Sequence, residues 1–472
     1  MPTDDFQIPA PPAVRPDLPV PFGVEALTGS LRDPYEPPEP EAVPLDSKHV
    51  LERGTKHLAI VPTSDPKKLE ESGWGVIFSS DADPAIREAL KPLLDRRKEQ
   101  VGSQHLFKVF DGAKGVFAGQ SAATWLANRG VGLAVVDPEN GVPFHLLLVG
   151  SPKQISFEFQ YTLDTQWSVG RLDFDKAEDY ATYAANIVAY ETAAAAPHGR
   201  DVAMWMPANG DTATNLLCND VGLPLHQLPL GTKPKFRLHS FLGNTATKAQ
   251  LSGILDGTAL GKTPAVLFTG SHGLEWPAAQ PVEQLGLQGA LVTQEWKAGV
   301  PVPPTAWFAG ADVPKTAALH GMVHYLFACF GGGCPTTDNY PPAGGVPKQI
   351  APEALVAALP KALLLQGAQA VVAHIDRAWS YSFQSGAGLP QNQLMRSVLD
   401  AMMLGFPVGL ATDFLNMQWG TLAAQLGLLV GPQAVTAPAP ATLSNLMVAR
   451  DDARNYIVLG DPAARLRTSE MV

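Results

Sequence analysis

The chain is poor in cysteine, in basic charge and in long apolar runs. Its 472 residues include only three cysteines, Cys218, Cys329 and Cys334, so a disulfide framework is not expected. Its 45 acidic residues outnumber 34 basic ones, for a formal net charge of −11. This balance argues against nucleic acid or an anionic membrane as the main partner.

Two further absences concern targeting. No apolar run approaches the roughly 18 consecutive residues needed to cross a bilayer, so no membrane segment is expected. The first five residues, MPTDD, are acidic and lack the basic-then-apolar pattern of a signal peptide. Together with the scarcity of cysteine, these features favour a reducing cytoplasm, which would keep a thiol nucleophile available.

The composition that is present, 46% apolar and 17% charged, is that of a globular protein with a large core. Residues 1–45 contain twelve prolines with scattered acids, which predicts an extended arm, poorly ordered or laid over the surface, and no independent domain. The alanine run 193–196 before Pro197 marks a junction. We therefore expect an N-terminal α/β subdomain over 46–196 and a second subdomain over 197–472.

Apolar runs and helical periodicities alternate along the chain, which predicts an α/β fold with mostly parallel sheets flanked by helices. Strands are expected at 56–61, 132–137, 144–150, 167–172, 201–206, 265–270, 323–328, 370–375 and 456–460. Helices are expected at 81–98, 122–128, 176–192, 248–255, 352–365, 390–404 and 414–428.

Two of these strands end on reactive side chains. The run 265–270 is followed by Ser271, His272 and Gly273, and the run 323–328 is followed by Cys329 and a group of glycines. Reactive groups in an open parallel sheet gather beyond the carboxyl ends of its strands. If these strands are neighbours, an imidazole and a thiol meet there, which is the combination of a base and a nucleophile.

A less specific interpretation applies to each of these residues. A lone cysteine after an apolar run is commonly a buried core residue, and Cys334, five residues on, is expected to be an incidental loop cysteine. The context favours chemistry at Cys329, because ACFG partly matches the caspase signature, and His272 lies 57 residues upstream. Gly273 would let backbone N–H groups approach an oxyanion closely.

This His-Gly and Ala-Cys pair resembles the caspase-like cysteine peptidases. The short blocks 146–150, 167–172, 183–191 and 458–462 look like gingipain-type peptidases, which are related to CHAT-domain proteases. The segment between His272 and Cys329 is longer than gingipains usually have. The resemblance implies a caspase-hemoglobinase-like fold and a cysteine endopeptidase without cofactor or metal. It also implies a protein or peptide substrate, a regulatory protein partner, and a role in bacterial defence or cell death.

The resemblance assigns provisional roles to individual residues. Cys329 would be the nucleophile, His272 the general base or acid, and the N–H groups of Gly273 and Cys329 the oxyanion donors. Asp211 follows the strand 201–206, where the family often places the base of the S1 pocket, so an acid there implies basic P1 residues; its alternative is a solvated turn. Trp379 would line S1 as an aromatic or belong to the core.

Two rival functions remain open at this stage. One is a catalytically silent interaction module that keeps the fold, against which the presence of both His272 and Cys329 counts. The other is a different thiol acyl-transfer enzyme, such as an amidase.

Overall fold

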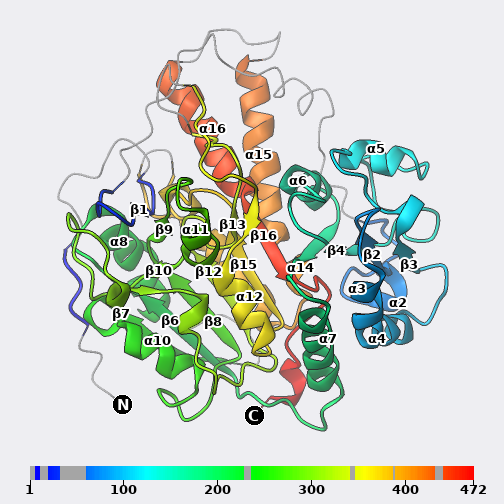
Figure 1. Ribbon diagram of the computed structural model, residues 1–472, viewed down its shortest axis with the longest axis horizontal. Helices are drawn as coiled ribbons and strands as arrows, with labels where there is room; N and C mark the ends of the chain where they lie inside the picture. Colours follow the sequence, from blue (N-terminus) through cyan, green and yellow to red (C-terminus); the bar gives the residue numbers. More distant parts are fainter. Residues whose placement is uncertain are drawn as a thin grey trace.

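A ten-stranded sheet runs through the protein in the computed structural model, which describes residues 6–10, 20–31, 60–227, 235–340, 346–385, 388–430 and 439–471 (Figure 1). Its neighbouring strands are parallel except for the pair β15 and β16. In spatial order the strands are β3 (Phe107–Phe110), β2 (Trp74–Phe78), β4 (His145–Val149), β5 (Ser168–Leu172), β16 (Tyr456–Gly460), β15 (Ala370–His374), β12 (Val323–Phe327), β8 (Val266–Gly270), β6 (Asp201–Met206) and β7 (Arg237–Leu242). The predicted α/β class is confirmed.

Helices cover both faces of this sheet. Along β6, Val202 and Met204 belong to one buried apolar cluster, whereas Ala203 and Trp205 belong to another. Successive strand residues point to opposite faces, so each face has its own core, as parallel sheets require. The longer helices are α4 (Lys91–Val101), α6 (Phe157–Asp164), α7 (Ala177–Thr192), α10 (Lys248–Leu255), α12 (Ala358–Leu365), α13 (Gln393–Met403), α15 (Asp413–Val430) and α16 (Pro440–Arg454). The shorter ones are α2 (Leu69–Ser72), α3 (Pro84–Ala89), α5 (Ala122–Ala127), α8 (Thr212–Leu217), α9 (Leu223–Gln227), α11 (Pro281–Leu287) and α14 (Val408–Ala411).

Two small sheets lie beside the large one. The first contains β1 (Gly23–Glu25), β9 (Gly273–Glu275), β10 (Leu291–Val292) and β11 (Trp307–Phe308). Strand β1 is parallel to β9, with Gly23 opposite Gly273. The second pairs β13 (Gly333–Cys334) with β14 (Leu355–Val356). Strand β9 therefore connects the N-terminal segment directly to the residues that follow β8.

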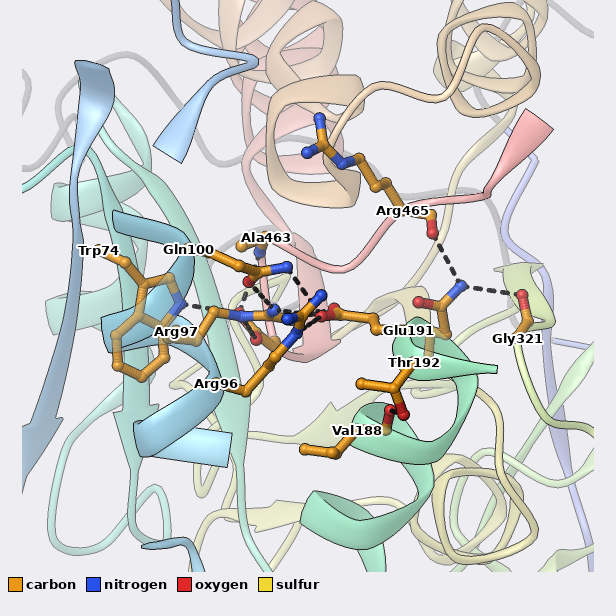
Figure 2. Close-up of polar contacts among 12 residues, drawn as sticks. Trp74, Arg96, Arg97, Gln100, Val188, Glu191, Thr192, Gly321, Ala463 and Arg465 are labelled. Atoms are coloured by element: carbon orange, nitrogen blue, oxygen red, sulfur yellow. Dashed lines mark hydrogen bonds and ion pairs between the residues drawn. The ribbon is translucent and has the colours of Figure 1, made fainter. Parts of the chain in front are cut away.

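The last strand joins the two halves of the sheet. Strand β16 lies between β15 and β5, and the turn after it carries Asp461, which accepts hydrogen bonds from Trp74 Nε1 at 3.0 Å and from Arg97 Nε at 2.6 Å. Figure 2 shows Arg97 of α4 extending toward Glu191 in the last turn of α7; Arg97 NH2 lies 2.7 Å from Glu191 Oε1. Burial by itself lowers the pKa of Arg97, but Asp461 and Glu191 more than offset this and raise it.

Most expected elements are present, with shifts of a few residues at their ends. The expected strand 132–137 is wrong. Its only bridge joins Val136 to Ile60, and Val131 and Leu133 instead cover the core formed with β4. The expected helix 81–98 divides into α3 and α4 at Leu90, because Pro92 cannot donate a helical hydrogen bond there. Strands β2, β3 and β7 of the large sheet and helices α6 and α16 were not predicted, and most of the expected strand 56–61 lies outside the described residues.

The N-terminal arm differs from the expectation where it is described. Residues 6–10 run beside the turn after β7, where Gln7 N donates to Asn244 Oδ1 at 2.8 Å. However, Phe22 and Val24 are fully buried, whereas Leu27 is 47% exposed, so residues 21–24 are packed inside the molecule and the arm reaches the surface again beyond them. The remainder of the arm is outside the described residues. Within the described residues, no helix is both long and apolar enough to cross a membrane.

Candidate active site

His272 and Cys329 lie at the carboxyl ends of neighbouring strands. Strands β8 and β12 pair in parallel up to Gly270 and Phe327, and the Ser271 N–H continues the ladder by donating to Phe327 O at 3.0 Å. Each reactive residue follows the last paired residue of its strand by two positions. Strands β8 and β12 are therefore neighbours, which is the condition under which the sequence predicted that the imidazole and the thiol meet.

Gly273 contacts the backbone of Cys329. A Cβ atom added at Gly273 would lie 1.8 Å from Cys329 O and 3.0 Å from Cys329 N. A side chain cannot fit there unless one of the two strand ends moves. Glycine at this position thus allows the segment after His272 to approach the thiol-bearing turn directly, and its role beside an oxyanion stays a prediction.

A buried carboxylate lies against His272. The imidazole is fully buried, and its Nε2 atom is 3.0 Å from Asp211 Oδ1. Asp211 is also the N-cap of α8, because its carboxylate accepts from Thr214 N at 3.0 Å and from Thr214 Oγ1 at 2.8 Å. Burial tends to raise the pKa of Asp211, but His272 and Thr214 outweigh it and lower that pKa to about 2. Asp211 is therefore ionised at neutral pH.

This placement corrects the picture of Asp211 as a pocket floor or a solvated turn. Its carboxylate is committed to His272 and Thr214, and only 6% of the residue is exposed. The local sequence Asn209-Gly210-Asp211 is by itself typical of a turn. The pairing with His272 depends on β6 lying beside β8, and no local pattern around Asp211 specifies that arrangement.

Cys329 lies at a sharp turn. The next residue, Phe330, has a φ of 57°, a value that non-glycine residues seldom adopt. Its N–H donates to Asp376 O at 2.8 Å, which connects the turn to the end of β15. Backbone strain of this kind is concentrated at functional sites. Cys329 therefore lies at the carboxyl end of β12, an interior strand of the sheet, directly before a strained residue.

The thiol of Cys329 is enclosed. It is fully buried and accepts a hydrogen bond from Ala378 N at 3.2 Å. Burial raises the pKa of Cys329, and the N–H groups of Ala378 and Phe22 and the charge of Arg377 act in the opposite direction without cancelling it. In this closed arrangement the sulfur is held as a neutral thiol.

Cys334 and Trp379 have different surroundings. Cys334 belongs to β13, is fully buried, and has its sulfur 3.5 Å from Gln288 Nε2, as a structural cysteine would. Trp379 is 2% exposed, and its ring lies edge-on to Tyr340 at a centroid distance of 5.1 Å. Its backbone forms a bridge with Pro21, so Trp379 borders the segment around Phe22; its role in S1 stays a prediction.

Phe22 is the site residue that sequence reasoning missed. Its carbonyl accepts from Gly273 N at 2.9 Å, and its N–H donates to Ala378 O at 3.1 Å. The only local hint was a phenylalanine followed by glycine and valine within a stretch of prolines and acids.

In the part of the chain that the structure describes, no group of His, Cys, Asp and Glu side chains could hold a metal ion.

Comparisons with known proteins give distant likenesses. No family model and no curated protein matches the chain. A solved structure described as "Structure of Protease" is similar over 84% of this chain and 78% of its own, with a TM-score of 0.49 and 14% identity. A separase–securin complex of Saccharomyces cerevisiae is similar over 67% of this chain, with a TM-score of 0.33 and 11% identity. This chain covers only 15% of that separase structure. The mostly parallel, helix-flanked sheet is consistent with a caspase-like fold, and the activity has to be argued from the site.

Proposed function

We propose that this protein is a caspase-like cysteine endopeptidase with Cys329 as nucleophile and His272 as its proton-transfer partner. The contact between Gly273 and the Cys329 backbone carries the proposal, because it brings the His-Gly and Ala-Cys strand ends together. The 3.0 Å approach of Asp211 to His272 adds the third group of a nucleophile, base and orienting acid. No residue in this scheme requires a cofactor.

The two ring nitrogens of His272 have different surroundings, which supports a division of roles. Both nitrogens are buried without a hydrogen-bond partner among the described residues, but Nε2 lies 3.0 Å from the Asp211 carboxylate as an ion-pair contact, and Nδ1 is the other ring nitrogen. Nδ1 is therefore the atom available to receive the proton of Cys329 and to return it to the leaving amine. The ionised Asp211 would fix the ring orientation and stabilise the imidazolium that forms.

The reaction would proceed by acyl transfer. The Cys329 sulfur attacks the carbonyl carbon of the scissile peptide, and its proton passes to His272. The resulting oxyanion accepts hydrogen bonds from the N–H groups of Gly273 and Cys329, as in other acyl-transfer sites. The amine leaves with the proton from His272, and water then hydrolyses the thioester and regenerates the thiol. Protein and peptide chains are the proposed substrates, and a regulated role fits the gingipain-type resemblance.

Digestion of a proteome-derived peptide library tests the proposal. The wild-type chain should cut peptides, Cys329→Ala should not, and Cys334→Ala is the matched control because it removes another buried thiol five residues away. An electrophilic peptide probe should label Cys329 faster than it labels a free thiol. A silent interaction module would show no such acceleration, and an amidase would hydrolyse small amides while leaving the library uncut.

A further inference from the structure

A segment of the N-terminal arm fills the space between the two reactive strand ends. Residues Val20 to Phe22 run antiparallel to residues 378–380: Phe22 N donates to Ala378 O at 3.1 Å, and Ser380 N donates to Val20 O at 3.2 Å. The next residues form β1, which pairs with β9 directly after His272. The segment is thus bound by its backbone on both sides of the site, as an extended peptide substrate would be.

The carbonyl of Phe22 occupies the position of a scissile carbonyl. Its oxygen accepts the Gly273 N–H at 2.9 Å, which is the donor that the proposed mechanism assigns to the oxyanion. The Phe22 N–H is one of the groups that act on the Cys329 thiol. In the proposed mechanism, the Phe22–Gly23 peptide bond would therefore be the one whose carbonyl meets an oxyanion donor, with Phe22 in the place of the P1 residue.

The Phe22 side chain lies in an aromatic environment. It is fully buried, and its ring is edge-on to Phe327 at 4.9 Å and to Phe383 at 5.9 Å, with the His272 ring at 5.9 Å. Edge-to-face packing at these distances is favourable for aromatic rings. A charged side chain in the same place would be desolvated without a dedicated partner.

The charged groups nearby are already paired. Asp211 is paired with His272 and Thr214. Arg377, whose charge acts on the Cys329 thiol, has its NH1 and NH2 atoms 2.5 and 2.9 Å from the two carboxylate oxygens of Asp338. Glu275, which also acts on the thiol, lies 3.8 Å from Arg377. Among the described residues, the charged groups that act on the thiol or on His272 therefore already have partners of opposite charge.

We propose that residues 20–25 occupy the substrate cleft as a built-in substrate mimic, so that the enzyme selects a large apolar, preferably aromatic, P1 residue and is blocked by its own N-terminal segment. This inference rests on the proposed function. It replaces the basic P1 preference expected from Asp211. An occupant tethered to the same chain competes at an effective concentration on the order of millimolar, so the wild type cuts external peptides slowly, through the fraction of molecules from which the segment has left.

The test compares three peptidyl acyloxymethyl ketones that differ only in P1: Phe, Arg and Asp. Each forms a bond between the Cys329 sulfur and the ketone methylene while the carboxylate leaves, and the labelled residue is identified by peptide mapping. The full-length wild type is compared with Phe22→Asp. Leu27→Asp is the matched control, since Leu27 is 47% exposed in the same segment. Phe22→Ala buries no charge and replaces Phe22→Asp if the latter unfolds.

We expect the Phe probe to label Cys329 in Phe22→Asp at least about tenfold faster than in the wild type, because an intramolecular competitor is removed. Leu27→Asp should match the wild type. In Phe22→Asp, the Phe probe should label Cys329 on the order of 100-fold faster than the Arg and Asp probes do. Faster labelling by the Arg or Asp probe, or an unchanged rate in both Phe22 variants, overturns the inference and leaves the proposed peptidase intact. If no peptide probe labels the opened variants faster than a free thiol, the proposed function itself fails.

Discussion

Replacing Asp211 by asparagine is the sharpest test of how the site works. The change keeps the shape of the side chain and an oxygen that can accept the Thr214 N–H, so α8 retains its cap. It removes the negative charge that lies 3.0 Å from His272 Nε2. The imidazolium formed during the reaction then loses its counter-charge, and the ring loses the acceptor that fixes its tautomer.

The size of the effect can be worked from the structure. The pKa of Asp211 falls from its ordinary 3.8 to about 2, which corresponds to a stabilisation of at most about 2 kcal/mol at 1.36 kcal/mol per unit. Because this pKa is depressed on folding, the stabilisation is present above about pH 4 and is lost as the pH falls toward 2. The cost in kcat should be larger, about 10²- to 10⁴-fold, as when a carboxylate that orients a catalytic histidine is neutralised.

Asp201→Asn is the matched control. Asp201 lies at the opposite end of the same strand β6, is 3% exposed, and has its Oδ1 atom 2.8 Å from His239 Nε2. Its pKa is likewise lowered to about 2. Peptide hydrolysis and thermal unfolding should be measured for both variants between pH 3 and 8. The reasoning is refuted if Asp211→Asn keeps kcat within a few-fold of the wild type, or if Asp201→Asn loses as much kcat.

Three further predictions concern other parts of the molecule. Cys329→Ala should lower kcat/KM for peptide hydrolysis by at least about 10³-fold, whereas Cys334→Ala should retain most of it; the reverse result would mean that the nucleophile is misassigned. Gly273→Ala should lower both activity, by about 10²-fold or more, and the melting temperature, because its Cβ would lie 1.8 Å from Cys329 O. Gly286→Ala in α11 is the control: the added Cβ would have no atom within 4 Å, so this change should lower neither the activity nor the melting temperature. Arg97→Met should reduce the free energy of unfolding by about 3–5 kcal/mol in urea titrations, because it removes the cationic partner of the fully buried Asp461; a loss below 1 kcal/mol would contradict the role given to that network.

Much of the candidate site could be predicted from local sequence. The apolar runs before His272 and Cys329 form strands β8 and β12 because they are short, bounded by glycine and able to fill a sheet covered on both faces. The glycine after His272 indicated a close backbone approach, and the structure contains one. The failure at 132–137 shows that an apolar run can cover a core without forming a strand: among the described residues its backbone bridges only at Val136, to Ile60, while Val131 and Leu133 pack on the core.

The sequence by itself determined the α/β class and the strand-end positions of His272 and Cys329, since each depends on hydrophobic periodicity within a few residues. Only the tertiary structure decided the contacts of Gly273 with Cys329, of Asp211 with His272 and of Phe22 with Gly273. Asp211 reaches His272 because β6 lies beside β8, and Phe22 reaches Gly273 across about 250 residues of chain. Contacts of that range are selected by the packing of the whole fold and leave no periodic pattern around the residues that make them.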